Sequence, residues 1–239
     1  MLLALFLIDA AAGLYLFLPL VGRRNAGVKF YRMILIVSGA LVLCAAVAHW
    51  DSSDAILVGL TAVVYITLRY PKRLIFRVPA ALLGAAYVIV ATQMWHVATG
   101  ATWPWSIAGA LSSIALLGSV NLAMLLGHWY LVVRGMSIDP LKRLTIATLA
   151  GVLLRTIVVA AALCIPGLWS AVAIRQGIFF WMRAGWGLVG PIALFPMVWG
   201  TVKIRSTMAA TGILYVDVVA VVIGEVLGGW LSAIAHAPV

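Results

Sequence analysis

Lysine and arginine are confined almost entirely to four short stretches of this chain, and long apolar segments separate those stretches. The connections between the basic stretches carry a single basic residue, Arg175. Short cytoplasmic loops of membrane proteins retain Lys and Arg, so this alternation predicts a chain that crosses a membrane repeatedly, with the basic stretches in the cytoplasm. Thirteen of the sixteen basic residues follow the pattern: Arg23, Arg24, Lys29, Arg32, Arg69, Lys72, Arg73, Arg77, Arg134, Lys142, Arg143, Lys203 and Arg205.

The composition supports the same class of protein. Charged residues make up 9% of the chain and hydrophobic residues 65%, with a mean hydropathy of +1.17. A soluble domain needs about 25% charged residues, so most of this surface must face lipid. The net charge of +10 follows from the loops that set the topology. It therefore argues against nucleic acid as a partner and predicts anionic lipids at the cytoplasmic face.

Eight segments are apolar enough for membrane helices, which need about 20 residues. They lack the alternation of a membrane β-barrel. We therefore expect an all-α polytopic integral membrane helix bundle of about eight transmembrane helices, with both termini on the non-cytoplasmic side. Residues 1–239 then form a single transmembrane helical domain without a soluble domain. The expected spans are 2–21, 33–49, 55–70, 78–97, 106–133, 144–165, 178–202 and 211–235.

The flanks of the first span indicate a retained helix. It has no basic residue before it, and Arg23 and Arg24 follow it, the reverse of a secretory signal peptide. We expect the protein in a bacterial inner (cytoplasmic) membrane. Trp50, Trp95 and Trp103 fall at the predicted outer ends of spans, where amphipathic aromatic side chains form belts.

Ionisable side chains inside the spans are the leading functional candidates, because each costs a few kcal/mol to insert. Helical geometry places Glu225, Gly229, Ser232 and His236 on one face of the last span, with Asp217 about 80° around. A polar side of this kind predicts a proton or quinone path. The candidates for that path are Asp9, His128, Arg155, Arg183, Asp217 and Glu225.

The same charges have a structural interpretation. Glu225 would pair with Arg155 and Asp9 with Arg183, and the two pairs would fix the register of the helices. The two interpretations are compatible, because a buried ion pair can also relay protons.

His128 stands in the segment Gly127-His128-Trp129-Tyr130. A lone histidine in a span ligates haem, relays protons or donates a hydrogen bond to a neighbouring helix. Gly127 beside it leaves room for a flat ring, but a bond between helices is the more frequent role.

His49, His96 and His236 lie at the outer ends of three spans and are the cofactor-binding candidates. Two histidines facing each other hold a b-type haem, because imidazole suits iron. Their neighbours Trp50 and Trp95 fit ordinary interface residues equally well. A CxxCH attachment motif is absent from the sequence. The cofactor is thus left open between haem and quinone.

The segment from Arg183 to Pro191 is rich in glycine. Pro191 and Pro196 each remove a helical hydrogen bond, which predicts a kink in this span. Glycines before a kink leave open backbone for a ligand or a partner.

These features favour an integral membrane subunit of a larger electron-transfer complex, of respiratory or photosynthetic type, that handles haem, quinone or protons within the bilayer. Other membrane subunits are then its partners. The alternatives are a proton-coupled secondary transporter that uses Asp9 and Glu225, and a purely structural or assembly subunit. We expect no catalysis by the chain alone, because no nucleophile motif, phosphate loop or metal motif occurs in it.

Overall fold

A computed structural model describes residues 1–70, 74–133 and 135–239. Of Arg24 it describes the backbone alone. Three of the basic loop residues, Lys72, Arg73 and Arg134, lie outside this description. All regular elements of the described part are helical, as the sequence predicts. They are α1 (Leu2–Val21), α2 (Arg23–Ala48), α3 (Ser52–Thr67), α4 (Leu74–Thr99), α5 (Trp103–Val132), α6 (Asp139–Leu163), η1 (Ser170–Ile174), α7 (Gly177–Ala184), η2 (Gly185–Val189), α8 (Gly190–Lys203) and α9 (Thr207–Ala235).

Seven helices of the described chain are long and apolar enough to cross a membrane. One of them is the continuous helix over residues 177–203, which combines α7, η2 and α8. The eighth predicted span corresponds to α3, which is apolar but has only 16 residues. The structure therefore supports at least seven crossings by length and composition, and the prediction of eight depends on α3.

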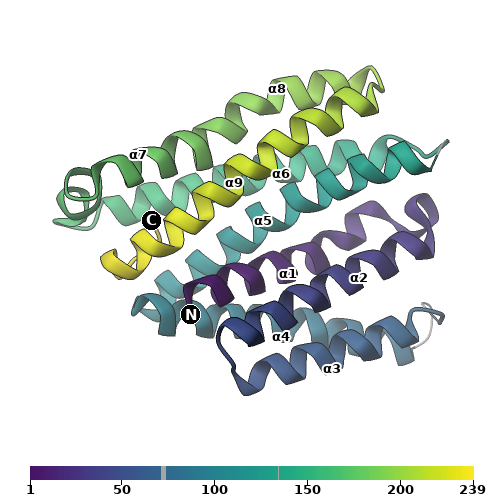
Figure 1. Ribbon diagram of the computed structural model, residues 1–239, viewed down its shortest axis with the longest axis horizontal. Helices are drawn as coiled ribbons and strands as arrows, with labels where there is room; N and C mark the ends of the chain where they lie inside the picture. Colours follow the sequence, from purple (N-terminus) through teal and green to yellow (C-terminus); the bar gives the residue numbers. More distant parts are fainter. Residues whose placement is uncertain (71–73, 134) are drawn as a thin grey trace.

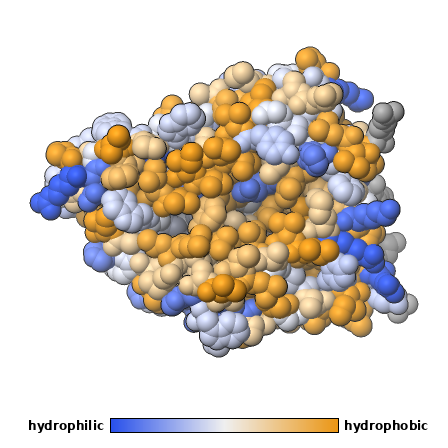
Figure 2. All heavy atoms as spheres, in the orientation of Figure 1, coloured by the Kyte–Doolittle hydropathy of each residue, from blue (hydrophilic) through white to orange (hydrophobic). Residues whose placement is uncertain are grey.

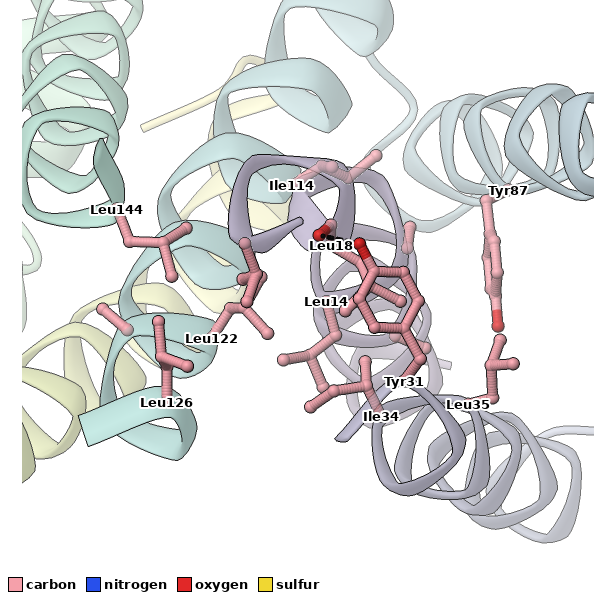
Figure 3. Close-up of a cluster of buried hydrophobic side chains, with 14 of the residues drawn as sticks. Leu14, Leu18, Tyr31, Ile34, Leu35, Tyr87, Ile114, Leu122, Leu126 and Leu144 are labelled. Carbon is pink, nitrogen blue, oxygen red and sulfur yellow. Dashed lines mark hydrogen bonds between the residues drawn. The ribbon is translucent and has the colours of Figure 1, made fainter. Parts of the chain in front are cut away.

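The helices lie side by side in one elongated bundle (Figure 1). The 30-residue helix α5 is its centre, because it packs against α1, α4, α6 and α9. One buried cluster of apolar side chains joins α5 to α1–α4; Figure 3 shows part of it, with Leu14, Ile34 and Leu122 from three different helices. A second cluster lies between α5, α6, α7 and α9.

The two ends of the bundle differ in charge. Both termini lie at one end, whereas the connections α1–α2, α3–α4, α5–α6 and α8–α9 turn at the other (Figure 1). The described residues of the basic stretches lie in these connections or in the adjoining parts of the helices, so we call this the basic end and the other the opposite end. Hydrophobic residues cover much of the middle of the face seen in Figure 2, and strongly hydrophilic residues gather mainly at the basic end. This distribution fits a membrane around the middle of the bundle.

Local sequence signals explain several helix ends. Asp51 caps α3 by accepting a hydrogen bond from the backbone N–H of Ser53 at 2.8 Å, and Asp54 bonds back to the N–H of Asp51 at 3.1 Å. This reciprocal arrangement satisfies the free N–H groups of a first turn. The bond from Ser53 also lowers the pKa of the Asp51 carboxyl, because it stabilises the ionised form.

The span predicted at 178–202 departs from α-helical geometry just before its first proline. Residues Gly185–Val189 form a turn of π-helix, and Pro191 follows within the first turn of α8. A π-turn inserts an extra residue into a helix and is frequent at functional sites. Here it directly follows Arg183 and α7.

Candidate functional site

The centre of the candidate site is Glu225 of α9, which faces two arginines. Its Oε1 accepts a hydrogen bond from Nε of Arg155, on α6, at 3.1 Å. Nη2 of Arg183, on α7, lies 2.8 Å from the same oxygen, within ion-pair distance although not aligned as a hydrogen bond. Both arginines are completely buried and Glu225 is 4% exposed. We call these three residues the charge triad.

Asp9 joins the charge triad through a tryptophan. The indole N–H of Trp95, on α4, donates to Oδ2 of Asp9, on α1, at 2.8 Å. The guanidinium of Arg155 lies 5.2 Å from the centre of the same indole ring, in cation–π range. Arg155 also donates from Nη1 to the hydroxyl of Ser112 at 3.2 Å. Side chains from α1, α4, α5, α6, α7 and α9 thus meet in one polar centre.

One of the two predicted ion pairs is present and the other is not. The Arg155–Glu225 pair is confirmed. The Asp9–Arg183 pair is wrong, because Arg183 contacts Glu225 and Asp9 accepts its hydrogen bond from Trp95. The predicted outer belt position of Trp95 is wrong as well, since its side chain is 1% exposed and serves as a bridge inside the bundle.

Glycines bring the helices around Arg183 into direct backbone contact. A Cβ on Gly187, in the π-turn, would lie 2.5 Å from Cα of Gly224 on α9 and 2.8 Å from Nη1 of Arg183. One on Gly228 would lie 2.7 Å from Nε of Arg183. Of the glycines predicted to leave room for a ligand, Gly187 admits the arginine itself, whereas nothing lies within 4 Å of a Cβ on Gly185. Gly187 and Gly228 together explain how a guanidinium fits between α7 and α9.

A cavity of about 340 Å³ lies beside the charge triad, between α1, α5 and α9. Its polar lining comes from Asp9, Trp95, Ser113 and Glu225. Its remaining walls are apolar or glycine: Leu2, Leu3, Leu5, Phe6, Val226, Leu227, Gly229 and Trp230. We call it the carboxylate cavity.

Several polar atoms at this centre have no hydrogen-bond partner in the described structure. They include Oδ1 of Asp9, Nη2 of Arg155 and all three guanidinium nitrogens of Arg183. A buried polar group without a partner is costly. Of these residues Asp9 alone lines the carboxylate cavity, so the cavity offers a free acceptor to a ligand that donates a hydrogen bond.

Asp217 and His128 lie nearer the basic end and apart from the charge triad. Asp217 is 3% exposed, its Oδ1 has no partner in the described part of the chain, and it borders a small pocket with Thr148 and Phe195. The ring of His128 is exposed, and its Nδ1 lies 3.4 Å from the hydroxyl of Tyr215 on α9. The contact agrees with the predicted bond between helices.

The space predicted beside His128 is filled. A Cβ on Gly127 would lie 2.9 Å from Oγ1 of Thr211, so this glycine serves the contact between α5 and α9.

The three outer histidines lie at the opposite end. His49 and His96 line one pocket of about 280 Å³. Nδ1 of His96 lies 2.7 Å from the carbonyl oxygen of Ala101, and its ring stacks on Trp103.

Nδ1 of His236 lies 2.7 Å from the carbonyl of Thr99. Metal-ligating histidines likewise bond one ring nitrogen to a carbonyl or carboxylate oxygen. Among the described residues, no group of three or more His, Cys, Asp or Glu side chains is arranged around a metal site.

Sequence reasoning missed Trp95, Ser112 and Ser113 as members of the site. Serines are frequent in membrane helices, and Trp95 sits one residue before His96 at a span end, where tryptophan is ordinary. The available signal was the two adjacent serines near the middle of α5.

The fold and the buried charges define a multi-pass integral membrane protein with a polar centre inside its helix bundle. The chain matches no protein-family model, no curated protein and no solved structure.

Proposed function

We propose that the protein is an integral membrane subunit of a larger electron-transfer complex, of respiratory or photosynthetic type, and that the carboxylate cavity holds a quinone-class ligand. The observation that carries this proposal is an apolar cavity whose polar lining includes two carboxyl groups, one of them with a free oxygen. Binding sites for small molecules combine apolar walls with a few polar groups in this manner.

The chemistry of a quinol fits this lining. Its ring and tail are apolar, and each hydroxyl donates a hydrogen bond that the free Oδ1 of Asp9 can accept. Oxidation of a quinol releases two protons and two electrons. The protons leave one after the other through Asp9, which passes each on to water, and the two electrons pass to a redox group of a partner subunit. The two arginines of the charge triad hold Glu225 in place at the wall of the same cavity.

The orientation is part of the proposal. The basic end faces the cytoplasm, both termini lie on the other side, and α3 forms an eighth crossing, in a bacterial inner membrane. The positive-inside rule supports this orientation. Since the described chain has little mass outside its helices, other membrane subunits and lipid are its expected contacts. The outer histidines remain candidates for haem, and an absorption spectrum of the purified protein tests them.

The test measures quinone binding by the purified protein, with decylubiquinone and a short-chain menaquinone as probes. Gly229→Leu fills the carboxylate cavity without touching a charge, because nothing lies within 4 Å of a Cβ there. We expect it to weaken binding about tenfold or more. Gly212→Leu, on the lipid-facing side of the same helix with equally open surroundings, is the matched control and should bind as the wild type does.

Saturable binding that Gly229→Leu abolishes and Gly212→Leu preserves supports the proposal. No saturable binding, together with no Soret band, no co-purified quinone and no partner chains, overturns it.

A second candidate function, proton-coupled transport, is favoured by the position of Asp217. Asp217 is a second buried carboxyl group on α9, and it lies closer to the basic end than Glu225. Its Oδ1 has no hydrogen-bond partner in the described structure. Transport predicts proton flux by the isolated chain in vesicles and its loss in Asp217→Asn, whereas the electron-transfer subunit gives no flux alone. A purely structural subunit shows neither flux nor quinone binding.

A further inference from the structure

A second large cavity lies on the other side of α1 from the charge triad. Its volume is about 840 Å³, and α1, α2, α3 and α4 form its walls. Arg23 is its one charged lining residue, and Tyr15 and Tyr31 have their hydroxyls bonded to the carbonyls of Ala80 and Leu18. Figure 3 shows the ring of Tyr31 beside Leu18 in this region. We call it the acyl groove.

The acyl groove is long and open along α4. Its α4 wall runs from Phe76 to Ile89, about 20 Å at 1.5 Å per residue. Ala81, Ala85 and Ile89 of this wall are exposed. One leaflet of a bilayer is about 15 Å thick in its hydrocarbon part. The acyl groove therefore has the length of one lipid chain and lies open on the side where lipid surrounds the bundle.

Arg23 gives this groove a charged head at the basic end. Its Nη2 donates to the carbonyl of Leu68 at 2.8 Å, and its guanidinium lies 5.9 Å and 6.0 Å from the ring centres of Tyr31 and Phe76. Its Nε and Nη1 are buried without a partner. The described structure contains no ion pair to Arg23. A guanidinium in such surroundings needs an anion.

We propose that the acyl groove binds one anionic phospholipid, with an acyl chain between α1 and α4 and the phosphate on Arg23. Arginine pairs with phosphate through charge-assisted hydrogen bonds, and a leaflet-length apolar groove that ends in an unpaired arginine has the shape and charge of this ligand. The site is separate from the carboxylate cavity and does not depend on the function proposed for it.

The test is native mass spectrometry of the protein in the presence of equal amounts of phosphatidylglycerol and phosphatidylcholine. The wild type should retain one phosphatidylglycerol molecule in preference to phosphatidylcholine. Arg23→Gln keeps a donor for the Leu68 carbonyl but removes the charge, and we expect its preference to fall about tenfold. Its control is Arg77→Gln, an exposed arginine of the same end that does not line the groove.

A second pair of variants tests the apolar part. Ala85→Phe fills the acyl groove and should reduce retention of both lipids, whereas Ala62→Phe, on the exposed face of α3 and outside the lining, should change neither. The proposal is overturned if the wild type retains no lipid or shows no preference. It is equally overturned if Arg77→Gln matches Arg23→Gln, or if Ala85→Phe retains lipid as the wild type does.

Discussion

At the scale of single residues, one carboxylate, that of Glu225, faces two arginines. Both guanidinium groups approach the same oxygen, and all three side chains are buried. The formal charge of the charge triad is positive by one. The three residues are therefore not equivalent. The carboxylate balances the charge of one arginine and leaves the other in excess, and it is the single anion of the charge triad.

This asymmetry predicts unequal costs of substitution. Glu225→Gln leaves two buried cations without an anion, and we expect a loss of about 3–5 kcal/mol in the free energy of unfolding. Arg183→Met leaves the neutral Arg155–Glu225 pair intact and should cost less than half as much. Unfolding in mixed detergent measures both, with Arg175→Met, an exposed arginine, as the unaffected control. A larger loss in Arg183→Met than in Glu225→Gln would contradict the prediction.

At the scale of helices, contacts between glycines set the closest approaches in the bundle. Gly13 of α1 meets Gly118 of α5, and a Cβ on Gly13 would lie 2.5 Å from the carbonyl oxygen of Ile114. Gly187 and Gly224 form the corresponding contact between η2 and α9. Small residues allow membrane helices to pack backbone to backbone, where dispersion and weak hydrogen bonds accumulate. The polar centre lies among helices that these contacts hold together.

Adding one methyl group at such a contact should separate two helices. Gly118→Ala forces α1 and α5 apart, and we expect a loss of about 1–3 kcal/mol in unfolding free energy from overpacking. Gly200→Ala has nothing within 4 Å of the added atom and should be neutral or gain up to about 1 kcal/mol from lower backbone entropy in the unfolded chain. The same unfolding assay compares the two, and equal effects would refute the role of the glycine contact.

The helices themselves were predictable from the sequence to within a few residues at most ends. The predicted span 2–21 coincides with α1, and 106–133 lies close to Trp103–Val132. Hydropathy is a local property, and the bilayer fixes the length of each apolar run. The exception is α2, which begins ten residues before its predicted start, since the basic stretch at its beginning is helical on both sides of a break at Gly27.

The partners inside the bundle were predictable only in part. Arg155 and Glu225 are rare charges at similar expected depth, so their pairing followed from electrostatics. Arg183 and Asp9 could not be assigned in this way, because which helices touch depends on packing between surfaces that one sequence does not display. Trp95 shows the difference: a residue of ordinary interface type becomes the bridge between Asp9 and Arg155 because α4 packs against α1 and α5.

At the scale of the whole molecule, the charge difference between the two ends predicts the orientation. Ser137, between α5 and α6, and Ser170, in η1, are both exposed and lie at opposite ends. Single cysteines at these positions, with Cys44 and Cys164 replaced by Ala, should react differently with a membrane-impermeant thiol reagent on intact cells. We expect labelling of Ser170→Cys without lysis and of Ser137→Cys only after it. The reverse pattern would invert the proposed topology.

The order in which the residues of the charge triad follow one another in the sequence also affects how their helices insert into the membrane. Arg155 and Arg183 are translated before Glu225, so α6 and α7 are synthesised before the counter-ion that they share in the described structure. Each uncompensated arginine costs about 2.5–3.5 kcal/mol on insertion scales. The arrival of α9 removes that cost for both helices at once. Until α9 is inserted, the two guanidinium groups need a polar environment, which the translocation machinery or nearby water would have to provide.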